Sequence, residues 1–256
     1  MIKHLCKQFL YLLVLFSATD AMAWSYTSKD FKEEMLSPIY SRPANQVFLY
    51  GSLLSLSLKY FGKKEIIYPF QESISKKNRL GDWNDRIEIM GRWVPNLLYA
   101  GGMGLKYYLS KDKNGKGDRD EKPLEKSLAM MRATLYASTL TVILKYTVRQ
   151  PRPGGGQKTS FPSGHTTTAF AFASVVGSFH EWYYAIPAYT IATAVAFQRL
   201  TNNNHYLHDV IAGATIGIAY GLGVSKAVKN KNSFMDNMTI LPISSDGMMM
   251  AYSYRF

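Results

Sequence analysis

The sequence predicts an all-α protein: a helical bundle followed by a small C-terminal β-hairpin. Apolar stretches with helical texture recur along the chain, and proline, glycine or asparagine turns separate the later ones. The tail differs, because Asp246-Gly247 separates two short runs, which is a strong hairpin signal. With 47% hydrophobic and 19% charged residues, the composition is that of a folded chain rather than a disordered one.

Residues 1–23 have the layout of a secretory signal peptide. Lys3 and Lys7 form a positive start, an apolar run follows, and small residues precede Trp24. The alternative is an uncleaved membrane anchor, but the run is shorter than the ~20 residues that a span needs. Cys6, the only cysteine, lies in this segment, so the mature chain is expected to have no disulfide and no cysteine metal site.

The chain is basic, with a formal net charge of +12. A positive surface suits anionic partners such as lipid headgroups or nucleic acid. An exported protein rarely meets nucleic acid, so anionic lipids at a membrane surface are the expected partners. We therefore expect a periplasmic or membrane-associated protein of the cell envelope; the alternative is that the charge only aids solubility.

The first half of the chain contains two apolar stretches of helical texture, at residues 47–61 and 93–109. Residues 24–44 are a polar segment in which one amphipathic turn is expected, and residues 63–86 are charged and expected to be irregular. The loop at 111–126 resembles a calcium loop in part, but lysine and proline replace needed ligands, so it is interpreted as solvated.

The second half predicts four helices. The first covers residues 124–149 and ends before two prolines, and the second begins at Pro162 and continues to about residue 179. The others cover residues 182–199 and 205–228, on either side of a turn of three asparagines. Glycines recur at helical spacing in the last helix and favour close helix contacts: Gly213, Gly217, Gly221 and Gly223.

The predicted helices fit a protein core better than a membrane span. The longest charge-free runs, residues 183–198 and 210–224, are about 15 residues long, and the mean hydropathy of −0.13 is low. Tilted spans are the alternative. We expect three parts: a signal peptide at 1–23, a helical domain at 24–235 whose chemistry lies in 124–228, and a hairpin tail at 236–256.

Two segments of this domain can bind an anion. Lys145 lies near a helix end and Arg152 lies between two prolines, so two cations can converge on one phosphate, although such residues are common at helix ends. Ser163 and Gly164 begin the next helix, whose unpaired N–H groups form an anion cradle. His165 is placed to donate a proton there; the alternative is an incidental histidine in a serine-capped helix.

A third segment offers a nucleophile. His205 and Asp209 are four residues apart, so a helix places them on one face. A carboxylate on one imidazole nitrogen leaves the other free to attack. Arg199 can reach the same anion, whereas His208 lies on another part of the helix and receives no role. Zinc held by these histidines and Asp209 is the competing interpretation, but the adjacent cations would repel a metal.

Together the three motifs resemble the signature of the type-2 phosphatidic acid phosphatase and vanadium haloperoxidase superfamily. The motifs are Lys145-x6-Arg152-Pro153, Pro162-Ser163-Gly164-His165 and Arg199-x5-His205-x3-Asp209. Gln198 departs from the family, which often has serine there. The loop between the first two motifs is short, which leaves the site open to a bulky substrate.

The resemblance implies a role for each motif residue. His205 attacks phosphorus and forms a phosphohistidine, Asp209 orients His205, and His165 protonates the leaving alkoxide and then helps activate water. No metal or other cofactor is required. The phosphate oxygens are held by Lys145, Arg152, Ser163, Gly164 and Arg199.

The resemblance also implies an enzyme, a phosphatase acting on phosphate monoesters or pyrophosphates. Phosphorylated envelope lipids are the expected substrates, and small phosphate esters are the alternative, as for a soluble broad-specificity acid phosphatase. A vanadate-dependent haloperoxidase is a third interpretation, although those enzymes are usually larger. A non-enzymatic phosphate binder would be favoured by loss of a signature residue, and none is lost.

Overall fold

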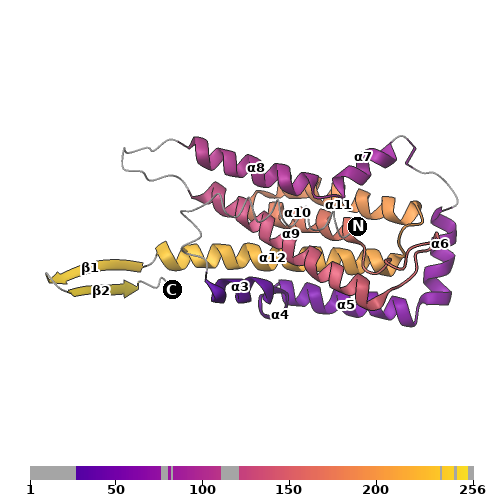
Figure 1. Cartoon of the computed structure of the whole chain (residues 1–256), viewed down its shortest axis with the longest axis horizontal. Helices are drawn as coiled ribbons and strands as arrows, with labels where there is room; N and C mark the ends of the chain where they lie inside the picture. Colours follow the sequence, from indigo (N-terminus) through magenta and orange to yellow (C-terminus); the bar gives the residue numbers. More distant parts are fainter. Residues whose placement is uncertain are drawn as a thin grey trace.

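The computed structural model of the chain describes residues 27–75, 80–81, 83–110, 121–236, 238–244 and 247–252. The predicted signal peptide at 1–23 and most of the 111–126 loop lie outside these residues. The all-α prediction is confirmed within the described part. Long helices run along one axis of an elongated bundle (Figure 1), and α10 contacts α9, α11 and α12. The long helices are α5 (Ala44–Tyr60), α8 (Val94–Leu109), α9 (Lys122–Val148), α10 (Gly164–Phe179), α11 (Trp182–Thr201) and α12 (Leu207–Asp236).

The expectation of irregular structure at 63–86 is wrong. Ile67 and Ile74 are buried, and Ile74 packs against Leu200 and Val210 from α11 and α12. Short helices are marginal alone and depend on such tertiary burial, which a charged composition conceals. The polar segment before α5 likewise forms more than one turn. The short helices are α3 (Ser28–Met35), α4 (Ser37–Tyr40), the π-helix η1 (Lys63–Ile67), α6 (Tyr68–Ser75) and α7 (Trp83–Met90).

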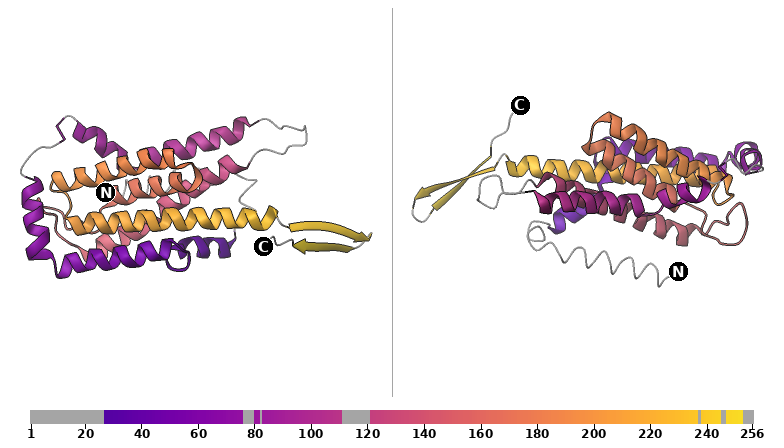
Figure 2. Two further views of the ribbon diagram at one scale, coloured as in Figure 1. Left: turned by 180° about the vertical axis from the view of Figure 1, so that it is seen from behind. Right: turned by 90° about the horizontal axis from the view of Figure 1, so that it is seen from above.

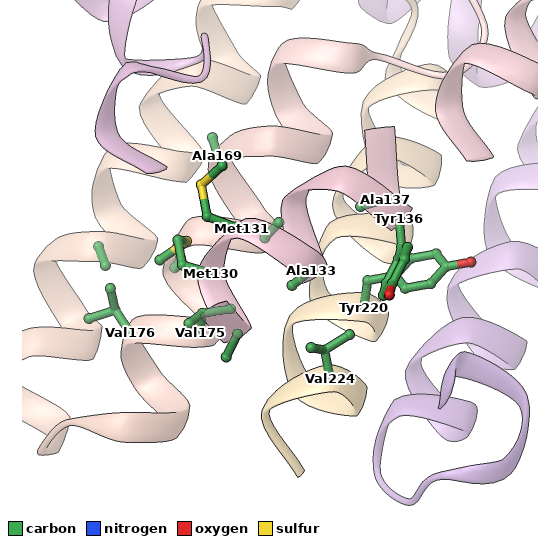
Figure 3. Packing of buried hydrophobic residues seen from close by; sticks show 14 of the residues in the cluster. Met130, Met131, Ala133, Tyr136, Ala137, Ala169, Val175, Val176, Tyr220 and Val224 are labelled. Atoms are coloured by element: carbon green, nitrogen blue, oxygen red, sulfur yellow. The ribbon is translucent and has the colours of Figure 1, made fainter. Parts of the chain in front are cut away.

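The core lies between α9, α10 and α12, with further residues from α8 and α11, and consists mostly of small residues (Figure 3). Alanines such as Ala133 and Ala169 alternate with larger side chains such as Met130 and Tyr220. A side chain at Gly213 would meet the carbonyl oxygen of Ser163 at 2.5 Å. This close approach confirms the expected helix contact and fixes the start of α12 beside the start of α10.

The ends of several helices meet at one end of the bundle, opposite the hairpin (Figure 1). α9 ends before Arg149, which is in the left-handed conformation with φ 49°, and α11 ends before the asparagine turn, where Asn203 has φ 58°. The amide of Gly154 donates to the carbonyl of Asn203 at 3.0 Å, which ties the loop after α9 to that turn. The predicted turn is therefore present, and it brings the first and third motifs together.

The tail forms the predicted hairpin. Strand β1 (Met238–Ser244) pairs with β2 (Gly247–Tyr252) in antiparallel register, with Met238 opposite Tyr252. It extends beyond the end of α12, away from the helix ends just described (Figures 1 and 2).

Among the residues that the structure describes, two helices are long and apolar enough to cross a membrane, by length and composition only: α9 and residues Leu207–Asn230 of α12. Both exceed the charge-free runs considered from the sequence. In the α12 segment 72% of the apolar window is buried, as in a core helix, whereas in α9 only 44% is buried. α9 therefore leaves a larger share of its apolar window unburied than α12 does.

Candidate active site

The structure brings the three sequence motifs together where α9 and α11 end and α10 and α12 begin. The amide of Ser163, which precedes α10, donates to the carbonyl of Asp209 in α12 at 3.0 Å. A side chain on Gly164 would lie 3.7 Å from Cε of Lys145 in α9. The end of α9 and the starts of α10 and α12 therefore meet at one position, which brings residues of all three motifs close together.

Three cations converge on this position with too few anions. Electrostatic interactions couple Lys145 to Arg152 and Arg152 to Arg199. Lys145 Nζ donates to the carbonyl of Thr159 at 2.7 Å, but Nε of Arg152 is buried and makes no hydrogen bond to a described residue. Burying unbalanced cations is costly, so the site is suited to an anionic ligand.

Arg199 is held in place by Gln198, the residue that departs from the family pattern. Nε of Arg199 donates to Oε1 of Gln198 at 2.5 Å, and Nε2 of Gln198 donates to Oδ1 of Asn84 in α7 at 3.0 Å. Both Gln198 and Arg199 are buried. The glutamine therefore orients the arginine and connects it to α7, a role that sequence reasoning did not assign.

His205 and Asp209 lie together, although not on one helix face as expected. α12 begins at Leu207, so His205 belongs to the turn before it. Its Nδ1 lies 3.7 Å from Oδ2 of Asp209, longer than a hydrogen bond. Burial lowers the pKa of His205 to about 4, although Asp209 opposes the shift. The imidazole is thus neutral at neutral pH, as a nucleophile must be.

Asp209 is held by more partners than the sequence suggested. It is fully buried, and its Oδ2 accepts hydrogen bonds from Oγ of Ser160 at 2.5 Å and from the amide of Tyr206 at 2.9 Å. Nε2 of Gln150 donates to its Oδ1 at 3.2 Å. Several donors on one carboxylate keep it ionised and fixed in orientation.

His208 was given no role from the sequence, and the structure contradicts its separation from the site. Its Nε2 lies 3.1 Å from Oδ1 of Asp209 and 2.9 Å from Nε2 of Gln150, and its ring stacks on Tyr206. The prediction placed His208 on another part of the helix, away from the site. In the structure, the side chain of Asp209, the next residue in the first turn of α12, contacts the ring of His208. His208 therefore helps to fix the carboxylate that faces His205.

The second motif begins α10, and its serine is already engaged. Ser163 caps the helix without a side-chain hydrogen bond to the backbone; its hydroxyl pairs with that of Thr166 at 2.9 Å, and its amide is bound to Asp209. His165 lies in the first turn, where burial, followed by the charge of Arg199, lowers its pKa to about 3. Its Nε2 makes no hydrogen bond to a described residue.

A carboxylate that sequence reasoning missed also faces this position. Oε2 of Glu88, in α7, lies 3.1 Å from Nη2 of Arg199, and its Oε1 lies 4.0 Å from Nε2 of His165. No motif marks Glu88, which is far from the three segments in sequence. Only the docking of α7 on α11 brings it into the site.

No group of three or more His, Cys, Asp or Glu is placed to hold a metal ion among the residues that the structure describes. The zinc alternative from the sequence rested on His205, His208 and Asp209. In the structure, Nε2 of His208 and Nδ1 of His205 lie beside different oxygens of Asp209, and these oxygens are already bonded to Gln150 and Ser160.

The comparisons with known proteins agree with the motifs. Residues 126–233 match the model of the PAP2 superfamily. Over 81 residues the chain is 42% identical to a lipid A 1-phosphatase from Porphyromonas gingivalis. That alignment covers 30% of this chain and spans only 18% of the length of that relative.

Two crystal structures share the fold. The first is LpxE from Aquifex aeolicus, with TM-score 0.50 and 22% identity, covering 62% of this chain and 94% of that one. The second is a transmembrane PAP2-type phosphatidylglycerolphosphate phosphatase from Bacillus subtilis, with TM-score 0.55 and 20% identity, covering 73% of this chain and 94% of that one. The resemblance expected from the motifs is confirmed: residues 126–233 of this chain match the PAP2 superfamily.

Proposed function

We propose that the chain is a phosphatase that hydrolyses phosphate monoesters or pyrophosphates of envelope lipids through a phosphohistidine on His205. The observation that carries the proposal is the convergence of Lys145, Arg152 and Arg199 on the buried pair of His205 and Asp209. Such a site can bind and polarise a tetrahedral phosphate, and phosphoryl transfer depends mainly on this positioning and charge stabilisation.

In the first step, the neutral imidazole of His205 attacks phosphorus in line. A bond forms between a ring nitrogen of His205 and phosphorus as the ester bond from phosphorus to oxygen breaks. His165 gives its proton to the departing alkoxide, and the three cations hold the other phosphate oxygens. Asp209 stabilises the positive charge that develops on the imidazole, and its own fixed position maintains the orientation of His205.

In the second step, water attacks the phosphohistidine. His165, now neutral, accepts a proton from the water as the new bond from oxygen to phosphorus forms and the bond to His205 breaks. Inorganic phosphate leaves, and both histidines return to their initial protonation states. The chemistry needs no metal, because the cations of the protein supply the positive charge that a metal would otherwise provide.

Two named relatives support a lipid substrate, since one is a lipid A 1-phosphatase and another a phosphatidylglycerolphosphate phosphatase. The outer surface of the bundle supports it as well, because large apolar side chains on three helices are exposed there. These include Leu49, Leu53 and Leu54 of α5, Leu98, Leu105 and Leu109 of α8, and Ile186 and Ile191 of α11.

Exposed aromatic residues lie at both ends of this apolar surface. Trp182 and Tyr183 begin α11, at the far end from the site, whereas Tyr60 ends α5 and Phe61 follows it, beside the site. Aromatic side chains favour the two interfaces of a membrane. We propose that lipid contacts the sides of the bundle and that the site opens at one interface. The proposal includes export directed by residues 1–23, which lie outside the described part.

The test is a panel of phosphorylated substrates presented to the purified full-length protein. The panel includes phosphatidic acid, phosphatidylglycerol phosphate, polyprenyl pyrophosphate, lipid A and a small phosphate ester. We expect the protein to release phosphate from one of the lipids. Vanadate should block this release, chelators should leave it unchanged, and His205→Ala should abolish it. Equal turnover of the small ester would favour the acid phosphatase alternative, and normal turnover by His205→Ala would refute the mechanism.

A further inference from the structure

Glu88 reaches the candidate site from outside the PAP2 match, which begins at residue 126. It lies between two guanidinium groups: Nη2 of Arg92 donates to its Oε1 at 3.0 Å, and Nη2 of Arg199 lies 3.1 Å from its Oε2. Burial alone would raise the pKa of the Glu88 carboxyl, but the Arg92 hydrogen bond and the charge of Arg199 hold it below its usual value. Glu88 is therefore an anion at neutral pH.

The helix that carries Glu88 is fixed at both ends. Asn84 accepts a hydrogen bond from Gln198 of α11, and the carbonyl of Gly91, just after α7, accepts one from Thr168 of α10 at 2.5 Å. A side chain on Gly91 would come within 3.0 Å of Cβ of His165. The end of α7 is thus packed directly on His165, so the Glu88 carboxylate has a defined place beside the imidazole.

The surroundings of His165 disfavour a proton on its ring. Arg199 on α11, His205 in the turn after it and Arg92 all oppose the positive charge, and Glu88 acts in the other direction. Two further charged groups come from the other helices that pack on α10: Lys145 of α9 and Asp209 of α12. Asp209 is already held by Ser160 and Tyr206, so Glu88 is the carboxylate placed to serve His165.

This arrangement answers a requirement of the proposed mechanism. The histidine that protonates the leaving group must carry a proton when the substrate is bound, yet its burial and its cationic neighbours remove that proton. The oxygen of Glu88 nearest to Nε2 of His165 is 4.0 Å away, within the range in which an opposite charge favours the protonated form.

We propose that Glu88 is a positioning residue for the leaving-group step, which stabilises the protonated form of His165 and ties it to the phosphate-binding Arg199. The inference rests on the proposed phosphatase function. Glu88 stays ionised throughout. The proton passes from His165 to the ester oxygen as the bond from phosphorus to oxygen breaks, and His165 recovers one from water in the second step.

The test compares two substrates that differ in leaving group. n-Octyl phosphate leaves as an alkoxide and needs protonation, whereas p-nitrophenyl phosphate leaves as a stable phenolate and needs little. We expect Glu88→Gln to lower kcat for n-octyl phosphate by about 10- to 100-fold, and for p-nitrophenyl phosphate by no more than about 3-fold. The alkaline limb of kcat for n-octyl phosphate should move to lower pH, because removing the carboxylate lowers the pKa of His165.

A second variant predicts a shift of opposite sign. Arg92 is exposed to solvent, and it holds the same Glu88 oxygen that faces His165. Arg92→Ala removes a positive charge near His165 and frees that oxygen, so the alkaline limb should move to higher pH. The matched control is Asp85→Asn, which removes one negative charge from the exposed face of α7 and should leave both rates unchanged.

Two outcomes would overturn the inference. An equal loss on both substrates with unmoved pH profiles would show that Glu88 only stabilises the fold. A lower KM in Glu88→Gln with unchanged kcat would show that Glu88 competes with the phosphate for Arg199. Failure of the phosphatase proposal itself looks different: the unsubstituted protein would release no phosphate, or His205→Ala would remain active.

Discussion

Buried charges are arranged differently at the two ends of the helical bundle. At the end near the hairpin, Glu34 of α3 and Arg132 of α9 form a nearly buried ion pair at 2.9 Å, and the hydroxyl of Tyr136 also donates to Glu34. In that pair each charge faces an opposite charge. At the other end, the motif cations outnumber the carboxylates that face them. The difference indicates that the first end stabilises the fold, whereas the second is built to receive an anion.

The largest expected effect is on stability, at the end with this ion pair. Glu34→Gln removes a carboxylate that pairs with the buried Arg132, and breaking such a pair typically costs about 3–5 kcal/mol. We expect a clear drop in Tm with kcat per folded molecule unchanged. The double variant Glu34→Gln with Arg132→Met should recover part of the loss. A loss of kcat in the folded fraction would break the comparison.

At the end with the motif cations, removing a cation should lower activity and leave stability intact, the opposite of the Glu34→Gln result. Arg152→Met removes a charge that Lys145 and Arg199 repel, so we expect Tm to stay constant or rise. Phosphate hydrolysis should fall by about 10²- to 10³-fold in kcat/KM, since a positioned charge on the transition state is lost. Arg149→Met, at an exposed neighbouring position, is the matched control and should remain within about 2-fold. A strong loss of stability in Arg152→Met would contradict the interpretation.

The pH dependence of stability should also report on the end with the motif cations. Burial lowers the pKa of His205 to about 4 in the folded protein, below the ~6.5 of an exposed histidine. Between these values the unfolded chain binds the extra proton, so stability should fall as the pH drops from about 6.5 to about 4, by up to ~3 kcal/mol. Thermal melts of the unsubstituted protein and His205→Asn across this range measure the difference, and identical slopes would exclude it.

The smallest expected effect concerns the support of Arg199. Gln198→Ala removes the oxygen that accepts from Nε of Arg199, without removing a charge. We expect kcat/KM to fall by about 5- to 20-fold, in line with the loss of one charge-assisted hydrogen bond. Steady-state kinetics check the change, and Gln198→Glu should retain more activity than Gln198→Ala because it keeps the acceptor. Equal activity of the two variants would argue against this role for Gln198.

The sequence predicted the long helices and the motif residues that meet at the site, because both depend on local signals. Pro151 and Pro153 end α9, and the residue types at Lys145, Arg152 and His205 are those that phosphate chemistry requires. Helix starts were less accurate. The expected start at Pro162 is observed at Gly164, and the expected start at His205 is observed at Leu207.

The supporting residues could not be predicted, because tertiary packing alone gives them their partners. Ser160 and Gln150 lie in a loop and contact Asp209 only after α9 and α12 have packed. Glu88 belongs to a short helix in a part of the chain that the motifs do not cover. From the sequence, Glu88 is one of several charged residues in a segment expected to be solvated. Its partner Arg199 follows only from the packing of α7 on α11.

The most direct test of the central claim is detection of the phosphohistidine. The protein is mixed with a radiolabelled phosphate ester, quenched in base within one turnover, and digested for mass spectrometry. The account predicts phosphate on the imidazole of His205 in the unsubstituted protein and none in His205→Ala. Phosphate on another residue, or hydrolysis that continues in His205→Ala, would contradict it.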